Sequence, residues 1–119
     1  MSEAPVATPA YVRSTTDTTV WEPFVVGGKA TGEVHWLRTT AADSERTLLT
    51  GLWRSEPRTF AYPFAADETV IVLDGELLIE YPDGETLTMV PGDIASFTKD
   101  TVTTWTVVKS FKKLFVING

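Results

Sequence analysis

Residues 68–76 read Glu-Thr-Val-Ile-Val-Leu-Asp-Gly-Glu, and this stretch decides the fold. Residues 69–73 form a short run dominated by apolar and β-branched side chains, which is typical of a buried strand. Asp74-Gly75 follows at once. Asp-Gly between two β-rich runs is the strongest short-range hairpin signal, because both central positions of a type I′ turn need positive φ. We therefore expect a strand, a tight turn at Asp74-Gly75, and a second strand from Glu76 onward.

The alternation of strand and turn extends in both directions. Pro82-Asp83-Gly84 and Pro91-Gly92-Asp93 are two further turn signals, and Ser110 separates two final β-rich runs. The predicted strands lie at 34–38, 47–53, 58–64, 69–73, 76–81, 86–90, 94–97, 103–109 and 112–117. No long stretch shows the 3.6-residue apolar period of a helix. Short strands between regular turn signals predict an all-β sandwich or closed barrel.

The length of 119 residues suits one compact domain, which we place at residues 20–119. Residues 1–19 hold two prolines and a Ser/Thr-rich run, and we expect a loosely ordered arm or one that pairs with a sheet edge. No apolar run approaches the ~20 residues that span a bilayer, and no signal peptide is visible. The expected protein is soluble and cytoplasmic, with no membrane partner.

Composition excludes several classes of function. The chain has no cysteine and a single histidine, so disulfides, thiolate metal sites and local clusters of histidine ligands are excluded. Ten Lys and Arg against sixteen Asp and Glu give a formal net charge of −6, which disfavours nucleic-acid binding. No glycine-rich loop precedes a helix, so no nucleotide cofactor is predicted, and we expect no cofactor of another kind.

Two motifs in order resemble the cupin superfamily. Glu68 is followed by six residues and Gly75, and Gly92-Asp93 comes later, with an aromatic at Trp105. Over residues 45–117 the sequence is most similar to a group of small single-domain cupins. This group is related to the (S)-ureidoglycine aminohydrolase cupin domain and to the ethanolamine-utilisation cupins. The resemblance implies a cupin jelly-roll β-barrel of two antiparallel sheets and a homodimer.

This chain departs from the metal-binding members of that superfamily. Those proteins place two histidines before the glutamate and a third after Gly-Asp. Here the corresponding positions hold Tyr62, Phe64 and Thr103, so only Glu68 remains of four usual ligands. One carboxylate does not hold a transition metal tightly without imidazole donors. We therefore predict a metal-free site.

Glu68 is the main candidate for a functional residue. In the cupin register it faces into the barrel near Tyr62 and Phe64, where it acts as a general base or anchors a ligand's amine or hydroxyl. The alternative is a structural ion pair with Arg54, Lys112 or Lys113. Tyr62 with Glu68 is the only acid–base pair that the sequence suggests.

The remaining candidates are ligand-binding residues: Trp53, Tyr62, Phe64, Thr103, Trp105 and Lys113. Aromatic walls of this kind stack on a planar or apolar ligand, although each ring also fits an ordinary barrel core. Thr103 either offers its hydroxyl to a ligand or is a plain strand former. Lys112 and Lys113 alternate across a strand, so only one points inward. Lys113 matches the position of a lysine in the family that the chain resembles, and it is the candidate to neutralise Glu68.

The sequence leaves three functions open. The first is a metal-independent small-molecule binding domain with its ligand in the barrel mouth near Glu68. The second is an enzyme that uses Glu68 as general base and Tyr62 as acid on a small nitrogenous or hydroxylated substrate. The third is an assembly unit whose barrel is filled by core side chains.

Two further residues are expected to be structural. His35 lies outside the motifs, and Asp93 is expected to cap its turn.

Overall fold

The computed structural model describes residues 11–26, 28–40 and 47–119. Within them the chain is all-β, as predicted, and every strand pair is antiparallel. The strands are β1 (Glu22–Val26), β2 (Lys29–Thr39), β3 (Leu48–Ser55), β4 (Arg58–Pro63), β5 (Asp67–Glu80), β6 (Thr86–Met89), β7 (Ile94–Phe97) and β8 (Val102–Asn118).

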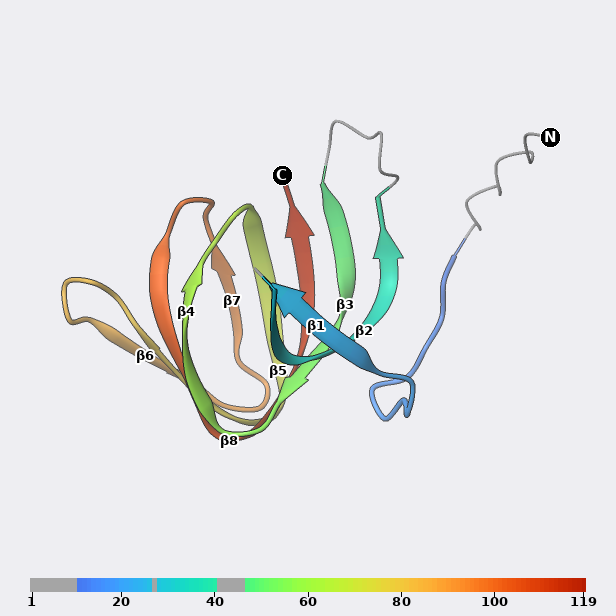
Figure 1. Cartoon of the computed structure of the whole chain (residues 1–119), viewed down its shortest axis with the longest axis horizontal. Helices are drawn as coiled ribbons and strands as arrows, with labels where there is room; N and C mark the ends of the chain where they lie inside the picture. The colour runs from blue at the N-terminus through green and yellow to red at the C-terminus, as the bar shows by residue number, and fades with distance from the viewer. Residues whose placement is uncertain (1–10, 27, 41–46) are drawn as a thin grey trace.

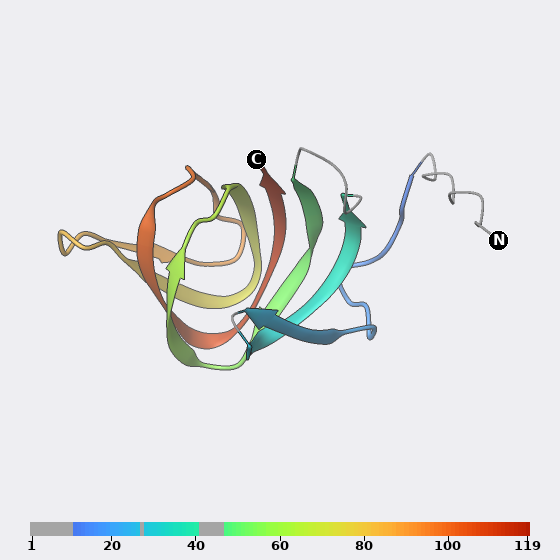
Figure 2. The same ribbon diagram turned by 45° about the horizontal axis from the view of Figure 1, so that its top comes forward.

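Two long strands, β5 and β8, hold the barrel together, and both curve strongly in Figures 1 and 2. Their first and last halves pair with different neighbours. One wall runs in the order β1-β2-β3, then the end of β8, the start of β5, and β7. The other consists of β4, the start of β8, the end of β5, and β6. The two expected sheets are therefore two walls of one hydrogen-bonded sheet.

The predicted hairpin at Asp74-Gly75 is wrong, and so is the predicted break at Ser110. Both positions lie inside continuous strands, β5 and β8, at the place where these strands bend together. Gly75 has φ +85° and its backbone lies against the Ser110 carbonyl. Register shifts around Gly75 move the buried positions of β5 from even to odd residue numbers. A positive φ is typical of a turn, but at Gly75 it forms a bulge inside a continuous strand.

The other turn predictions are confirmed. Tyr81 and Glu85 close the turn at Pro82-Asp83-Gly84, and the hairpin that it joins projects from the barrel (Figure 1). At the third turn, the Val90 amide donates to the Asp93 carboxylate at 2.9 Å, so Asp93 caps this turn as expected.

Period-two alternation places the core between the walls. Trp105, Val107, Phe111 and Phe115 all lie at odd positions of β8 and are buried. They form one buried apolar cluster with inward residues of β5 and β6, among them Val72, Leu77, Ile79 and Met89. The inward row of β8 also carries Lys113, the one buried lysine of the described residues.

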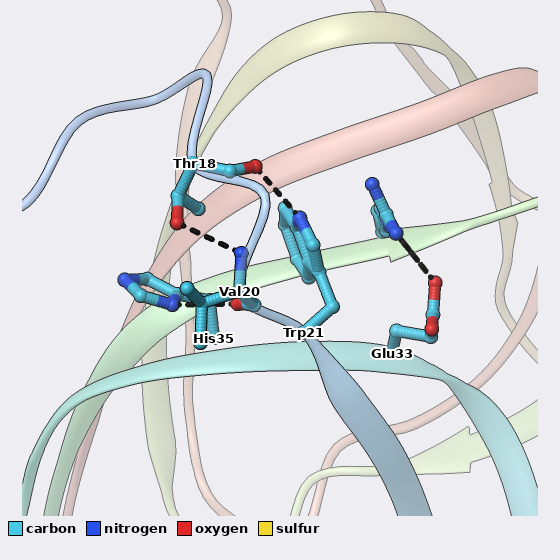
Figure 3. A network of polar contacts seen from close by, with 6 residues as sticks. Thr18, Val20, Trp21, Glu33 and His35 are labelled. Carbon is cyan, nitrogen blue, oxygen red and sulfur yellow. Dashed lines mark hydrogen bonds and ion pairs between the residues drawn. The ribbon is translucent and has the colours of Figure 1, made fainter.

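The segment before β1 lies on the outer face of the barrel. Both ring nitrogens of His35 on β2 are engaged there, with the Val20 carbonyl and the Ser14 hydroxyl, each at 2.8 Å. Figure 3 shows His35 beside Thr18, Val20 and Trp21. The arm predicted at 1–19 falls partly outside the described residues; residues 11–19 make no strand. None of the described residues belongs to a helix that is long and apolar enough to cross a membrane.

Candidate functional site

A cavity of about 150 Å³ lies between the two walls of the barrel. Strands β3 and β5 and the end of β8 form one side of the cavity. Strand β4 and the start of β8 form another side, and the β1–β2 hairpin forms a third. Its lining residues are Phe24, Lys29, Thr31, Trp53, Phe60, Ala61, Tyr62, Glu68, Trp105, Lys113, Phe115 and Ile117. The cavity is thus mainly aromatic, with a small group of polar side chains.

Glu68 is the centre of that polar group. It belongs to the inward row at the start of β5 and is only 2% exposed. The Tyr62 hydroxyl on β4 donates to its Oε1 at 2.6 Å. The Lys113 ammonium on β8 donates to its Oε2, also at 2.6 Å. Three strands thus bring together three titratable groups in one continuous chain of short hydrogen bonds.

Lys113 is buried, with its amine surrounded by aromatic rings. Its Nζ lies 4.5 Å from the ring centre of Trp105 and between 5.3 and 5.6 Å from those of Trp53, Tyr62 and Phe115. Burial lowers the pKa of Lys113, and the Glu68 carboxylate acts in the opposite direction. The aromatic faces and the carboxylate replace the water that an ammonium loses on burial.

Tyr62 is held as a hydrogen-bond donor. Burial raises its pKa, and the negative charge of Glu68 and the hydrogen bond to it raise the pKa further. Its phenol therefore remains protonated across the neutral range. The Thr103 hydroxyl donates to the backbone carbonyl of Tyr62 at 2.7 Å, which helps to fix the strand that carries this tyrosine.

The aromatic walls contact one another mainly edge to face. Trp53 meets Phe60 at 5.9 Å and Trp105 at 6.2 Å between ring centres, and its indole N–H donates to the Thr31 carbonyl. Trp105 also lies 4.4 Å from Tyr62. The indole N–H of Trp105 is buried and has no acceptor among the described residues. These contacts leave flat apolar surfaces around the polar group.

Five of the seven sequence-predicted ligand-binding residues line this cavity: Trp53, Tyr62, Glu68, Trp105 and Lys113. The other two lie behind it. Phe64 is buried and stacks on Phe97 at 4.6 Å, and Thr103 supports Tyr62 through its carbonyl. Of the alternatives for Glu68, Lys113 is its partner, whereas Arg54 pairs with Glu33 and Lys112 with Asp74.

Sequence reasoning missed other lining residues. Phe60 shares strand parity with Tyr62, and Phe115 and Ile117 share it with Lys113, so the period-two rule was a sufficient signal for these three. Phe24, Lys29 and Thr31 belong to the β1–β2 hairpin. Their place depends on how that hairpin folds over the barrel, which no local pattern indicates.

The residues at the ligand positions of metal-binding cupins do not fit a divalent transition metal. Glu68 is the only strong donor among them, and its Oε2 already accepts from the Lys113 ammonium. No group of three His, Cys, Asp or Glu side chains comes together within the part of the chain that the structure describes. The Lys113 ammonium, a cation of the protein itself, neutralises this carboxylate at the place where a metal would bind.

A family model described as an EutQ-like cupin domain matches residues 42–115, which is more than half of the chain. The chain belongs to this family. The expected resemblance to the cupin superfamily and its ethanolamine-utilisation members is thereby confirmed, together with the jelly-roll fold. No curated protein matches the chain.

Solved structures agree with the family. A putative ethanolamine utilization protein Q from Salmonella typhimurium is 25% identical, with a TM-score of 0.61, covering 71% of this chain and 67% of that one. The EutQ protein of Clostridium difficile is 25% identical, with a TM-score of 0.59, covering 70% and 58%. A protein of unknown function from Rhizobium leguminosarum is 28% identical, with a TM-score of 0.54, covering 59% and 68%.

Proposed function

We propose that this EutQ-like cupin is a metal-independent small-molecule binding domain, with its ligand in the cavity beside Glu68. One observation carries the proposal: an aromatic cavity in which Tyr62, Glu68 and Lys113 converge from three strands. Apolar cavities with a few convergent polar groups are the usual form of small-molecule sites. An assembly unit with a filled core, the third function that the sequence leaves open, would lack such a space.

The size and lining of the cavity restrict the ligand. A volume of about 150 Å³ is enough for roughly one six-membered ring, as in an engineered apolar cavity that binds benzene. The flat walls favour a planar or compact apolar body. The polar group offers a carboxylate acceptor and an ammonium donor, so it suits a ligand with one amine or hydroxyl.

Binding is tested with a panel of one-ring amines and alcohols, such as benzylamine and benzyl alcohol. Ethanolamine is added because the Salmonella neighbour is named for its utilisation. Tryptophan fluorescence reports binding, since Trp53 and Trp105 line the cavity. Saturable binding by at least one ring compound is expected. No binding at millimolar concentration by any member would overturn the proposal.

A matched pair of variants places the ligand. Glu68→Gln keeps the shape and removes the charge, and we expect it to weaken amine binding about tenfold, the scale of one hydrogen bond to a charged group. Glu76→Gln makes the same change on the same strand, where the carboxylate pairs with Lys109 at 3.9 Å and does not line the cavity. It should leave the affinity unchanged. Equal effects would place the ligand elsewhere.

The second candidate is a metal-independent enzyme, with Glu68 as general base and Tyr62 as acid. The observation that favours it is that a carboxylate and a phenol, the two groups that such an enzyme needs, lie together in the cavity at 2.6 Å. If a substrate is found and its turnover survives Glu68→Gln, Glu68 is not the base.

The homodimer and the cytoplasmic location stay predictions from the sequence. Native mass spectrometry tests the homodimer.

A further inference from the structure

The cavity contains a lysine amine in an unusual setting. Lys113 carries a side chain that is 4% exposed, yet the residue lines the space where a ligand would sit. Lys112, its neighbour on β8, points to the opposite face and contacts Asp74 and the Thr16 carbonyl. The two adjacent lysines thus differ in surroundings while sharing the same strand.

We propose that Lys113 is a reactive amine that captures small aldehydes in this cavity as a covalent imine. The inference rests on the proposed function, because the aldehyde has to enter the same cavity. It goes further by assigning a covalent step, the atom that performs it, and a carbonyl compound as the class of ligand.

Glu68 supplies what the amine needs. An ammonium is not a nucleophile, so Nζ has to lose a proton before it attacks a carbonyl carbon. Glu68 Oε2 lies 2.6 Å away and accepts that proton directly. Burial lowers the pKa of Lys113, which makes this transfer less costly than for an amine in water.

The step balances in atoms and charge. Nζ attacks the aldehyde carbon, the C–N bond forms, and the carbonyl oxygen takes up protons and leaves as one water molecule. Lysine ammonium plus aldehyde therefore gives a protonated imine plus water, with no oxidant or reductant. Glu68 first accepts a proton from Nζ and then returns one to the departing oxygen. Tyr62, which donates to Oε1, stabilises the carboxylate while it carries out both transfers.

The site suits the product as well as the free amine. A protonated imine has the same single positive charge as the ammonium, so its ion pair with Glu68 is retained. The faces of Trp53, Tyr62, Trp105 and Phe115 surround that charge within 5.6 Å. They stabilise a cation through their quadrupoles and limit the access of the water that would hydrolyse the imine.

Reductive trapping with benzaldehyde tests the proposal. Benzaldehyde has the one-ring body that the cavity accommodates, and sodium cyanoborohydride near pH 7 converts its imine into a stable benzylamine. The wild-type chain should gain one benzyl group, and peptide mapping should place it on Lys113. We expect Lys113 to react at least tenfold faster than the exposed Lys109. Equal or slower labelling of Lys113 would overturn the proposal.

Matched variants and a carbonyl-free ligand complete the test. Lys112→Met should leave the labelling of Lys113 unchanged, whereas Lys113→Met should abolish the fast single-site reaction. If Lys113→Met does not fold, the relative labelling rates of the lysines in the wild-type chain decide whether the proposal holds. Benzyl alcohol has the same ring without the carbonyl, and its binding reports the proposed function alone. Benzyl alcohol binding without labelling of Lys113 refutes only the imine. The binding function is refuted as well only if no member of the panel binds.

Discussion

Gly75 on β5 lies directly against the carbonyl of Ser110 on β8, at the point where the two long strands bend together. A Cβ atom at Gly75 would clash with the Ser110 and Lys109 carbonyl oxygens, and Gly75 has φ +85°. On either side of this contact β5 and β8 pair with different neighbours, which creates the two walls. The cavity exists because the strands bend here.

Gly75→Ala should therefore destabilise the barrel more than an ordinary positive-φ substitution does. The left-handed conformation costs a non-glycine residue about 1–2 kcal/mol, and displacement of the Ser110 carbonyl adds to that cost. Urea denaturation measures the loss. Gly84→Ala is the matched control, because Gly84 has φ +91° and a Cβ atom there would meet none of the described residues within 4 Å. Equal losses of stability in the two variants would show that β8 moves to accommodate the added methyl group at little cost.

The same contact explains why the sequence was informative about strands but not about their continuity. Asp74-Gly75 and Ser110 each resemble a break, since positive φ and small polar residues are typical of turns. They lie in separate strands and are brought together only by the pairing of β5 with β8. A local pattern shows that the chain departs from regular strand geometry, but not whether it reverses or bends.

Loss of the Lys113 amine should destabilise the protein strongly. Lys113→Met leaves the buried Glu68 carboxylate without its cation, and removal of one partner of a buried pair costs about 3–5 kcal/mol. Lys112→Met removes an amine from a pair with Asp74 at 3.4 Å in which the aspartate is largely exposed. Such a pair contributes at most about 1 kcal/mol. Chemical denaturation of both variants gives the comparison.

A double variant separates the charge from the packing. Glu68→Gln combined with Lys113→Met removes both charges, so it should recover part of the stability that Lys113→Met alone loses. If the double variant is less stable than either single variant, the ion pair is not what makes the lysine important. The loss of stability in Lys113→Met would then come from poor packing of the methionine side chain.

Stability should fall as the pH rises above about 10, the ordinary pKa of a tyrosine phenol. The pKa of Tyr62 is raised in the folded protein, so the folded state keeps a proton that the unfolded state releases. Its contribution is complete below pH ~10 and is lost progressively above it, by up to about 1.4 kcal/mol for each pH unit. Denaturation at several pH values measures the slope.

Tyr62→Phe is the control, because the difference between the two pH profiles isolates this phenol from Lys113 and the surface groups. The wild-type excess slope should vanish in the variant. Ultraviolet absorbance of phenolate gives a second measurement: Tyr62 should not ionise before the protein unfolds. Parallel profiles for the two proteins would contradict the assignment.

The polar part of the site was more predictable than its walls. Glu68 and Lys113 were identified through the cupin register, and Tyr62 through its spacing from Glu68; all three meet in the structure. Phe64 has the same parity as Tyr62, yet it packs on Phe97 beyond the cavity. Parity tells which face of a strand a side chain occupies, whereas its depth depends on the opposite wall and has no signature along the chain.

Divalent transition metals should not stabilise the protein. Lys113 already provides a cation 2.6 Å from the Glu68 carboxylate, and a metal would have to displace it while gaining no imidazole donor. A ligand at a hundred times its Kd adds about 2.7 kcal/mol to stability, so even moderate binding would raise Tm measurably. Melting curves with Mn²⁺, Fe²⁺, Ni²⁺ or Zn²⁺ are compared with chelator-treated protein, and native mass spectrometry counts any adduct. A saturable one-to-one adduct that disappears in Glu68→Gln would mean that the carboxylate exchanges its lysine for a metal, and the metal-free interpretation would then be wrong.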